Sequence, residues 1–197
     1  MLSAFLRLII VGLFWSNAAN AQPIPAADLL GDTLLAEALR AKADAASEIK
    51  NDRYFSVIDY RAPSNVPRYV LIDTKDMSAE ALLVAHGKGS DRDHDGMADQ
   101  FSNIEGSKMT SLGAFVTGKT YYGMHGLSLK LKGISPQNDL AEKRLIVIHG
   151  ADYVSPNRRV LGRSWGCPAL ERDHAERIIP LIKGGSFLYA VGLEARG

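Results

Sequence analysis

The chain contains a single cysteine, Cys167, among 197 residues. A lone cysteine cannot form an internal disulfide, so a fold held together by disulfides is excluded. The thiol is therefore a buried apolar side chain, an intermolecular bridge or a reactive group. Gly166 and Pro168 flank it, and because both residue types are common in surface turns, they favour the reactive thiol.

The chain also lacks an excess of charge and a long apolar run. Its 23 Lys and Arg residues nearly balance its 22 Asp and Glu residues, so nothing indicates a nucleic-acid or anionic-membrane partner. The apolar stretch at 8–15 is shorter than the roughly 20 residues that a membrane-spanning helix needs, and we expect no transmembrane anchor.

Residues 1–21 have the pattern of a secretory signal peptide. Arg7 supplies the positive charge, the apolar stretch follows it, and the Ala-Asn-Ala run at 19–21 fits the small-residue cleavage rule. We therefore expect export to the periplasm or cell envelope. Removing this segment takes away Arg7 and lowers the net charge from +1 to zero.

The remaining chain has the length of one domain. A short linker is expected at 22–27, then an N-terminal helix at 28–50, where leucines and alanines recur at helical spacing and pack on the domain. The domain itself spans 51–197. Its short β-branched and aromatic runs, bounded by Gly, Pro or Asn, predict strands. These runs are 53–62, 68–74, 81–87, 112–123, 127–133, 144–150 and 186–192.

A second helix is predicted at 171–183, with Pro180 bending or ending it. The order is helix, many strands, helix, strand, which lacks the βαβ alternation of a parallel sheet. It predicts a mainly β fold with flanking helices, of the α+β class.

A cysteine nucleophile needs a base that accepts its proton. His149 is the best placed of the five histidines, because it ends a strongly apolar run and Gly150 lets the backbone turn at once. It precedes Cys167 by 18 positions, a distance that a loop closes easily. His86 and His125 also precede glycines after apolar stretches.

The His-Gly pair at 149–150, followed by Ser-Trp-Gly-Cys at 164–167, resembles the signature of the L,D-transpeptidase (YkuD-like) family. That signature is His-Gly, a short gap and Ser-His-Gly-Cys. The murein L,D-transpeptidase catalytic domain branch is especially similar, since it has comparable "HGADYVS", "GRSWGCPA" and "FSNIEGS…SLGAF" stretches. The resemblance spans roughly 50–192 and implies a single L,D-transpeptidase-like catalytic domain.

The resemblance also implies a site. Cys167 would be the nucleophile, His149 the base and the Gly150 carbonyl its orienting group, while the amides of Gly166 and Cys167 would form an oxyanion hole. The substrate would be a peptidoglycan stem peptide, which acylates the thiol and loses a terminal D-residue before an amine or water resolves the thioester. No metal or cofactor is needed. Carbapenems, which mimic the acyl donor, would be covalent inhibitors.

There are two departures from the wider family. Trp165 replaces its usual histidine, and Pro168-Ala169 replaces an aliphatic-arginine pair. Arg163 is the candidate for the role of that missing arginine. We therefore predict that Arg163, Ser164 and Trp165 contact the substrate.

Residues 101–126 are rich in Ser, Asn, Tyr and Gly. This composition is typical either of a substrate wall beside the thiol or of a turn-rich β-meander whose tyrosines pack on the core. On the first interpretation the substrate contacts are Asn103, Ser111, Tyr121, Tyr122 and His125.

Other motifs compete with this interpretation. Residues 162–166 match the G-x-S-x-G elbow of serine hydrolases, but the strand before them is poor and too little chain follows for the acid and histidine. The S-x-x-K match at 47–50 and the S-x-N match at 155–157 lack the K-T-G motif that accompanies them in penicillin-binding proteins. No histidine or cysteine spacing supports zinc.

The acidic loop, residues 91–99, places Asp at positions 1, 3, 5 and 9 and Gly at position 6 of a calcium loop. Position 12 is Ser102, which supplies no carboxylate, and the preceding segment resembles a strand rather than a helix. We therefore favour a solvated surface loop and expect no bound metal.

Three functions remain open. The chain is an L,D-transpeptidase, an L,D-carboxypeptidase in which water resolves the thioester, or a catalytically silent cell-wall-binding module in which Cys167 merely packs. A thiol activated by His149 is expected to alkylate well below its free pKa of about 8.5, which distinguishes an enzyme from a silent module.

Overall fold

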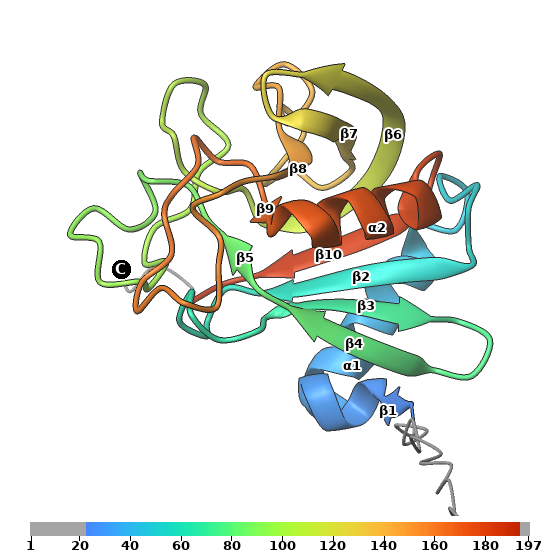
Figure 1. Cartoon of the computed structure of the whole chain (residues 1–197). Helices are drawn as coiled ribbons and strands as arrows, with labels where there is room; N and C mark the ends of the chain where they lie inside the picture. The colour runs from blue at the N-terminus through green and yellow to red at the C-terminus, as the bar shows by residue number, and fades with distance from the viewer. Residues whose placement is uncertain (1–22, 194–197) are drawn as a thin grey trace, which may run out of the picture.

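Two helices pack on opposite faces of one strongly curled β-sheet in the computed structural model, which describes residues 23–193 (Figure 1). The elements in chain order are β1 (Ile24–Pro25), α1 (Ala26–Asp44), β2 (Tyr54–Asp59), β3 (Tyr69–Asp73), β4 (Ser78–Leu82), β5 (Val84–Ala85), β6 (Gly113–Gly123), β7 (Gly126–Gly133), β8 (Val147–Gly150), β9 (Ala169–Leu170), α2 (Arg172–Ile182) and β10 (Phe187–Val191). The strand order is β1-β4-β3-β2-β10-β6-β7-β8-β9-β5. The predicted mainly β fold with flanking helices is confirmed.

The first helix differs at both ends from its prediction. It begins at Ala26, within the stretch expected to be a linker, because Pro25 already has the φ of −60° that suits a helix start and β1 pairs with β4. Gly31, at φ 72°, kinks the helix. It ends at Asp44, and the chain then turns, so residues 45–50 are not helical.

Every predicted strand run contains a strand, but two runs differ from their predictions, and β1 and β9 lie outside all of the predicted runs. The run at 81–87 contributes to two elements, because its first residues complete β4 and Val84–Ala85 form β5 against β9. The run at 144–150 becomes a strand only at Val147, since Leu145 has a left-handed φ of 57° that interrupts extended backbone. The predicted second helix is present as α2, with Pro180 in its last turn.

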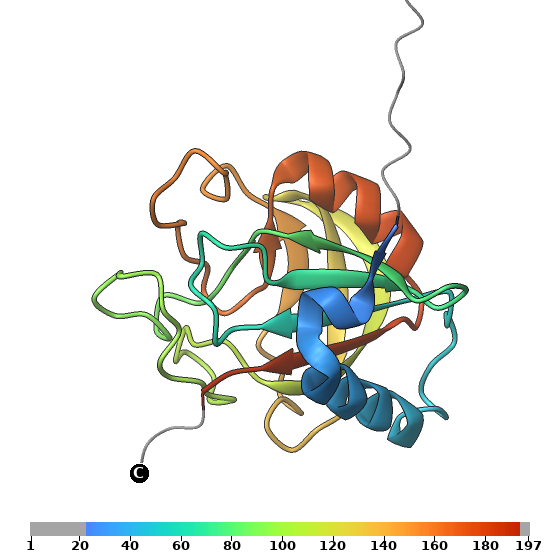
Figure 2. The same ribbon diagram turned by 90° about the horizontal axis from the view of Figure 1, so that it is seen from below.

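Alternate residues of β2 and β3 face different helices, as the two-residue period of a strand requires. Phe55, Val57, Val70 and Ile72 pack with α1, whereas Ile58, Tyr69 and Leu71 pack with α2. Figure 2 shows α1 lying across the near face of the sheet and α2 beyond the strands. Because both faces are covered, these strands are apolar at nearly every position.

The long connections at 86–112 and 151–168 lie side by side at one end of the sheet (Figure 1). The Ser164 amide donates to the His86 carbonyl at 2.9 Å, and the Lys88 amide donates to the Ser164 carbonyl at 2.8 Å. A Cβ on Gly87 would lie 2.9 Å from the Gly166 Cα, so only glycine allows this approach. This end of the sheet carries Cys167.

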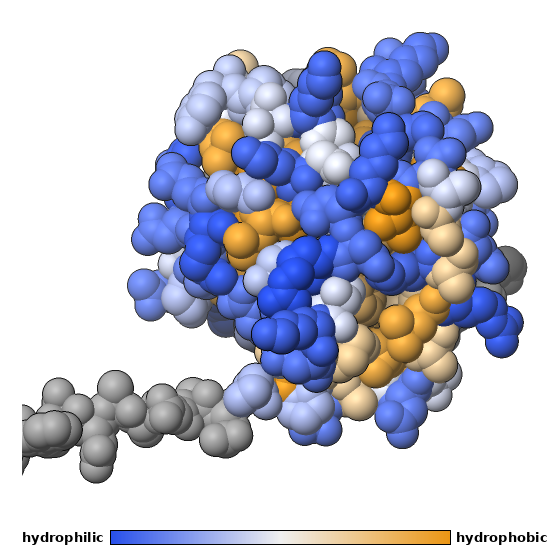
Figure 3. All heavy atoms as spheres, turned by 90° about the vertical axis from the view of Figure 1, so that its right-hand side faces the viewer, coloured by the Kyte–Doolittle hydropathy of each residue, from blue (hydrophilic) through white to orange (hydrophobic). Residues whose placement is uncertain are grey.

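The face shown in Figure 3 is mostly hydrophilic, with apolar atoms in separate patches. No helix in residues 23–193 has the length and apolar character needed to cross a membrane. The predicted signal peptide, 1–21, lies outside the described residues, so export and cleavage stay predictions.

Candidate active site

A parallel strand pair brings His149 beside the turn that carries Cys167. Strands β8 and β9 pair with His149 opposite Ala169. Because Cys167 precedes Ala169 by only two residues, its turn lies against β8. The thiol is half-buried, and its Sγ lies 3.7 Å from the carbonyl oxygen of Leu145, just before that strand. The loop between the two motifs thus closes the gap in the sequence.

The His149 imidazole is buried and held in one orientation. Its Nδ1 lies 3.0 Å from the Gly150 carbonyl, which can only accept, so Nδ1 carries the proton and Nε2 presents a lone pair. Burial lowers the pKa of His149, the bond to Gly150 opposes this, and His125, whose ring stacks at 4.2 Å, lowers it further. His149 is therefore neutral at pH 7, as a base must be.

Burial raises the pKa of the Cys167 thiol, although the Val147 backbone and the Arg144 guanidinium oppose this. The expectation of a thiol pKa below its ordinary value is thus wrong for this resting state, because desolvation outweighs both opposing contacts. Among residues 23–193, no hydrogen bond joins the thiol to His149. The resting pair is a thiol and a neutral imidazole, so the proton must move as the sulfur attacks.

Ser164 braces the cysteine turn. Its hydroxyl donates to the Cys167 carbonyl at 2.7 Å and accepts from the Gly166 amide at 3.0 Å. In this geometry the Gly166 amide, predicted as an oxyanion donor, is already engaged, whereas the Cys167 amide has no partner among the described residues. Neither a strand before Ser164 nor a helix directly after it is present, so the serine-hydrolase elbow is absent here.

Four of the predicted substrate contacts are exposed. Trp165, beside the thiol, is 70% exposed, and the Lys108 ammonium lies 4.7 Å from its ring centroid. The tip of the β6–β7 hairpin carries Tyr121, Tyr122 and His125. The ring of His125 stacks on the buried imidazole of His149, so this tip lies next to the proposed base.

The remaining predicted contacts are engaged in the scaffold. The Asn103 amide donates to the Asp139 carboxylate at 2.6 Å, and the Ser111 hydroxyl, which is buried, donates to a backbone carbonyl. Arg163 donates to the backbone carbonyl of Asp91. The contact of Arg163 with the substrate stays a prediction.

Sequence reasoning missed Arg144. Its half-buried guanidinium lies close to the Gly166 backbone and is electrostatically coupled to Cys167. The only signal in the sequence is a charged residue at the head of the apolar run 145–148.

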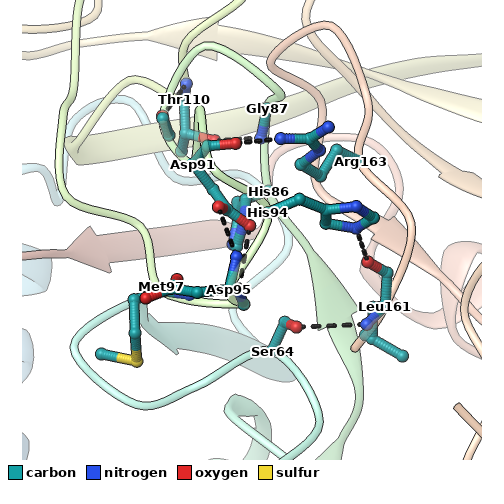
Figure 4. A network of polar contacts seen from close by, with 12 residues as sticks. Ser64, His86, Gly87, Asp91, His94, Asp95, Met97, Thr110, Leu161 and Arg163 are labelled. Atoms are coloured by element: carbon teal, nitrogen blue, oxygen red, sulfur yellow. Dashed lines mark hydrogen bonds and ion pairs between the residues drawn. The ribbon is translucent and has the colours of Figure 1, made fainter. Parts of the chain in front are cut away.

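A buried network anchors the acidic loop to the end of β5 (Figure 4). His86 Nε2 donates to the Asp91 carboxylate at 3.0 Å, and its Nδ1 accepts from Arg68 at 2.7 Å. The same carboxylate accepts the backbone amides of Asp95 and Gly96 at 3.1 and 3.2 Å. The His86 carbonyl also accepts a hydrogen bond from the Ser164 amide. The buried network is therefore connected directly to the turn that carries the thiol.

Side-chain oxygens of Asp91, Asp93 and Asp95 lie within 4.8 Å of one another. The Asp91 carboxylate is buried and already accepts three hydrogen bonds. Ser102, at the twelfth position, offers its carbonyl to Arg144 and has no carboxylate. The expectation that the acidic loop binds no metal stays a prediction.

The buried network predicts acid sensitivity. Burial, and then the nearby Arg68, lowers the pKa of His86 from 6.5 to about 4. The unfolded chain therefore binds a proton that the folded chain rejects, and stability falls as the pH drops from 6.5 to about 4. The gap corresponds to roughly 3 to 4 kcal/mol of unfolding free energy, at about 1.4 kcal/mol per pH unit.

Urea unfolding of the wild type and of His86→Gln at several pH values between 7 and 4 checks this prediction. The variant has no imidazole to protonate, so its stability is expected to change less across this range. Equal slopes in both proteins would show that His86 is not the group responsible.

The family model of the L,D-transpeptidase catalytic domain matches residues 27–191. A search of curated protein sequences finds no match. Similar solved structures include an L,D-transpeptidase from Mycobacterium smegmatis (10% identity, TM-score 0.45, covering 71% of this chain and 59% of that one). Others are L,D-transpeptidase 3 from Mycobacterium tuberculosis (11%, 0.47, 71% and 61%) and LD transpeptidase LdtMt1 in complex with imipenem (12%, 0.44, 71% and 59%).

The chain thus spans about three fifths of the length of these solved structures. The family model, in contrast, covers most of the chain, including nearly all of α1 and the whole sheet from β2 onward. The chain therefore belongs to the L,D-transpeptidase catalytic-domain family.

Proposed function

We propose that this domain is a cysteine acyl-transferase that acts on peptidoglycan stem peptides, with Cys167 as its nucleophile. The observation that carries the proposal is the pairing of β8 with β9, which sets a neutral imidazole, oriented by Gly150, beside the cysteine turn. A base with a free Nε2 lone pair and a thiol in a turn are the two parts that thioester chemistry needs.

In the acylation half-reaction, His149 Nε2 takes the proton of the Cys167 thiol as the sulfur attacks the carbonyl of an L-centre. The backbone amide of Cys167, which has no partner among the described residues, donates to the oxyanion. The C–N bond to the terminal D-residue then breaks, and the leaving amine takes the proton from the imidazolium. The product is a thioester on Cys167.

In the second half-reaction, an acceptor amine gives a proton to His149 and attacks the thioester. The C–S bond breaks, the new amide forms a cross-link, and the imidazolium returns its proton to the sulfur. Water in place of the amine gives a shortened stem and makes the enzyme an L,D-carboxypeptidase. Exposed Trp165 and the hairpin tip with Tyr121, Tyr122 and His125 are the surfaces proposed to contact the peptide.

Neither half-reaction needs a metal or cofactor. A carbapenem offers a strained acyl group to the same sulfur, so we propose this class as covalent inhibitors. The substrate lies outside the cytoplasmic membrane, and the signal peptide predicted at 1–21 would deliver the domain to the periplasm or cell envelope.

Incubation of the purified protein with isolated muropeptides, followed by mass spectrometry of the products, tests this function. We expect loss of the terminal D-residue together with cross-linked dimers. Shortened stems without dimers would assign the carboxypeptidase reaction instead. Unchanged muropeptides, bound but not converted, would identify a silent cell-wall-binding module and contradict the proposal.

A further inference from the structure

Arg144 is tied to one segment, residues 102–111. Its Nη1 donates to the carbonyl of Ser102 at 2.7 Å and to the hydroxyl of Ser111. Its Nη2 donates to the carbonyl of Met109 at 2.6 Å and, more weakly, to the hydroxyl of Ser107 at 3.4 Å. One guanidinium thus fixes both ends of a stretch that otherwise forms few regular backbone hydrogen bonds.

The same guanidinium lies against the cysteine turn. A Cβ on Gly166 would be 2.7 Å from the Met109 carbonyl oxygen and 3.2 Å from Arg144 Nη2. Gly166 also has a φ of 121°, a backbone angle that residues other than glycine rarely adopt. The backbone of the cysteine turn therefore packs directly against the Arg144 guanidinium and the Met109 carbonyl that accepts its hydrogen bond.

The charge of Arg144 has no partner of opposite sign. All four of its acceptors are neutral oxygens, and no carboxylate in residues 23–193 forms an ion pair with it. Taking a charge out of water is costly, and buried charges are therefore usually paired. The group nearby that can become negative is Cys167, and a cation there lowers the pKa of the thiol.

We propose that Arg144 is a positioning residue whose unpaired charge stabilises the Cys167 thiolate as it forms, and whose guanidinium holds residues 102–111 against the cysteine turn. Arg144 lies just before β8 and supplies a cation near the thiol. The chain has no cation directly after the cysteine, because Pro168 and Ala169 occupy those positions. The catalytic importance of this thiolate rests on the proposed function, but its stabilisation is measurable without any turnover.

Two variants separate the charge from the hydrogen bonds. Arg144→Gln keeps amide donors but loses the charge, whereas Arg144→Lys keeps the charge but loses the planar fork. Arg177→Gln is the matched control, because Arg177 pairs with Glu80 on the exposed side of α2. The rate of iodoacetamide alkylation, measured from pH 6 to 10.5 on the folded proteins, gives the apparent thiol pKa of each.

We expect Arg144→Gln to raise the apparent thiol pKa by about one unit, which makes alkylation at pH 8 about tenfold slower. Arg144→Lys is expected to stay within about half a unit of the wild type, although it loses comparable thermal stability, and Arg177→Gln is expected not to shift. A wild-type pKa in folded Arg144→Gln would overturn the proposal. If Arg144→Gln does not fold, a rise of about one unit in Arg144→Lys would overturn it instead.

The outcome is independent of the proposed function. A wild type that leaves muropeptides unchanged, together with a shifted thiol pKa in Arg144→Gln, would refute the enzyme but retain the role of Arg144. A wild type that converts muropeptides, together with an unshifted thiol pKa in Arg144→Gln, would support the enzyme but refute the role of Arg144.

Discussion

Replacing Cys167 with alanine is expected to lower muropeptide turnover by roughly 10⁴-fold or more, because the proposed acyl intermediate forms on its sulfur. The fold is expected to survive. The side chain is half-buried at the edge of the larger core cluster, so loss of its sulfur costs about 1 kcal/mol. Product analysis by mass spectrometry measures the first effect, and urea unfolding measures the second.

Ser164→Ala is the informative companion to this variant. Removing the hydroxyl releases the Gly166 amide and the Cys167 carbonyl, so we expect partial loss of activity and about 1 kcal/mol of stability. Substantial turnover by Cys167→Ala, with none by Ser164→Ala, would contradict the assignment of the nucleophile and point to the serine.

The second large effect is expected for His149→Ala, with turnover reduced by about 10²- to 10⁴-fold. The resting thiol is protonated at neutral pH, since burial raises the pKa of Cys167, and without His149 its proton has no acceptor positioned by β8. His174→Gln, on the partly exposed side of α2, is the control and should retain activity. Wild-type rates in His149→Ala would remove the base from the mechanism.

The pH profile provides a further test of the same residue. His149 must be neutral to accept a proton, and burial holds its pKa below the usual 6.5. Wild-type turnover should therefore fall on the acid side only below pH 6.5, as the imidazole becomes protonated. The residual activity of His149→Ala should lack this acid limb.

Much of the fold could be predicted from the sequence because its central strands are covered on both faces. The apolar runs at β2, β3 and β10 and the helical spacing of α2 are local patterns. The two-residue strands β1 and β9 are too short to carry a pattern, and they exist only through partners distant in the chain. The kink at Gly31 and the late start of β8 at Val147 likewise depend on individual backbone angles.

The two motif residues of the site could be predicted because their local sequence restricts the backbone. A histidine followed by Gly150 marks a strand end, and a cysteine between Gly166 and Pro168 marks a turn. Arg144 could not be predicted, because its role depends on acceptors 33 to 42 residues away along the chain. The thiol pKa was also beyond sequence reasoning, since it is set by burial rather than by the neighbouring residues in the chain.

The central claim, that Cys167 forms an acyl-enzyme, is tested most directly by intact-protein mass spectrometry after incubation with a carbapenem, followed by peptide mapping. We expect one covalent adduct per chain, located on Cys167, blocked by prior alkylation and formed markedly more slowly by His149→Ala. The absence of an adduct on the native protein, together with a thiol that alkylates only after unfolding, would contradict it. Cys167 would then be a packing residue, and the enzymatic function would fail with it.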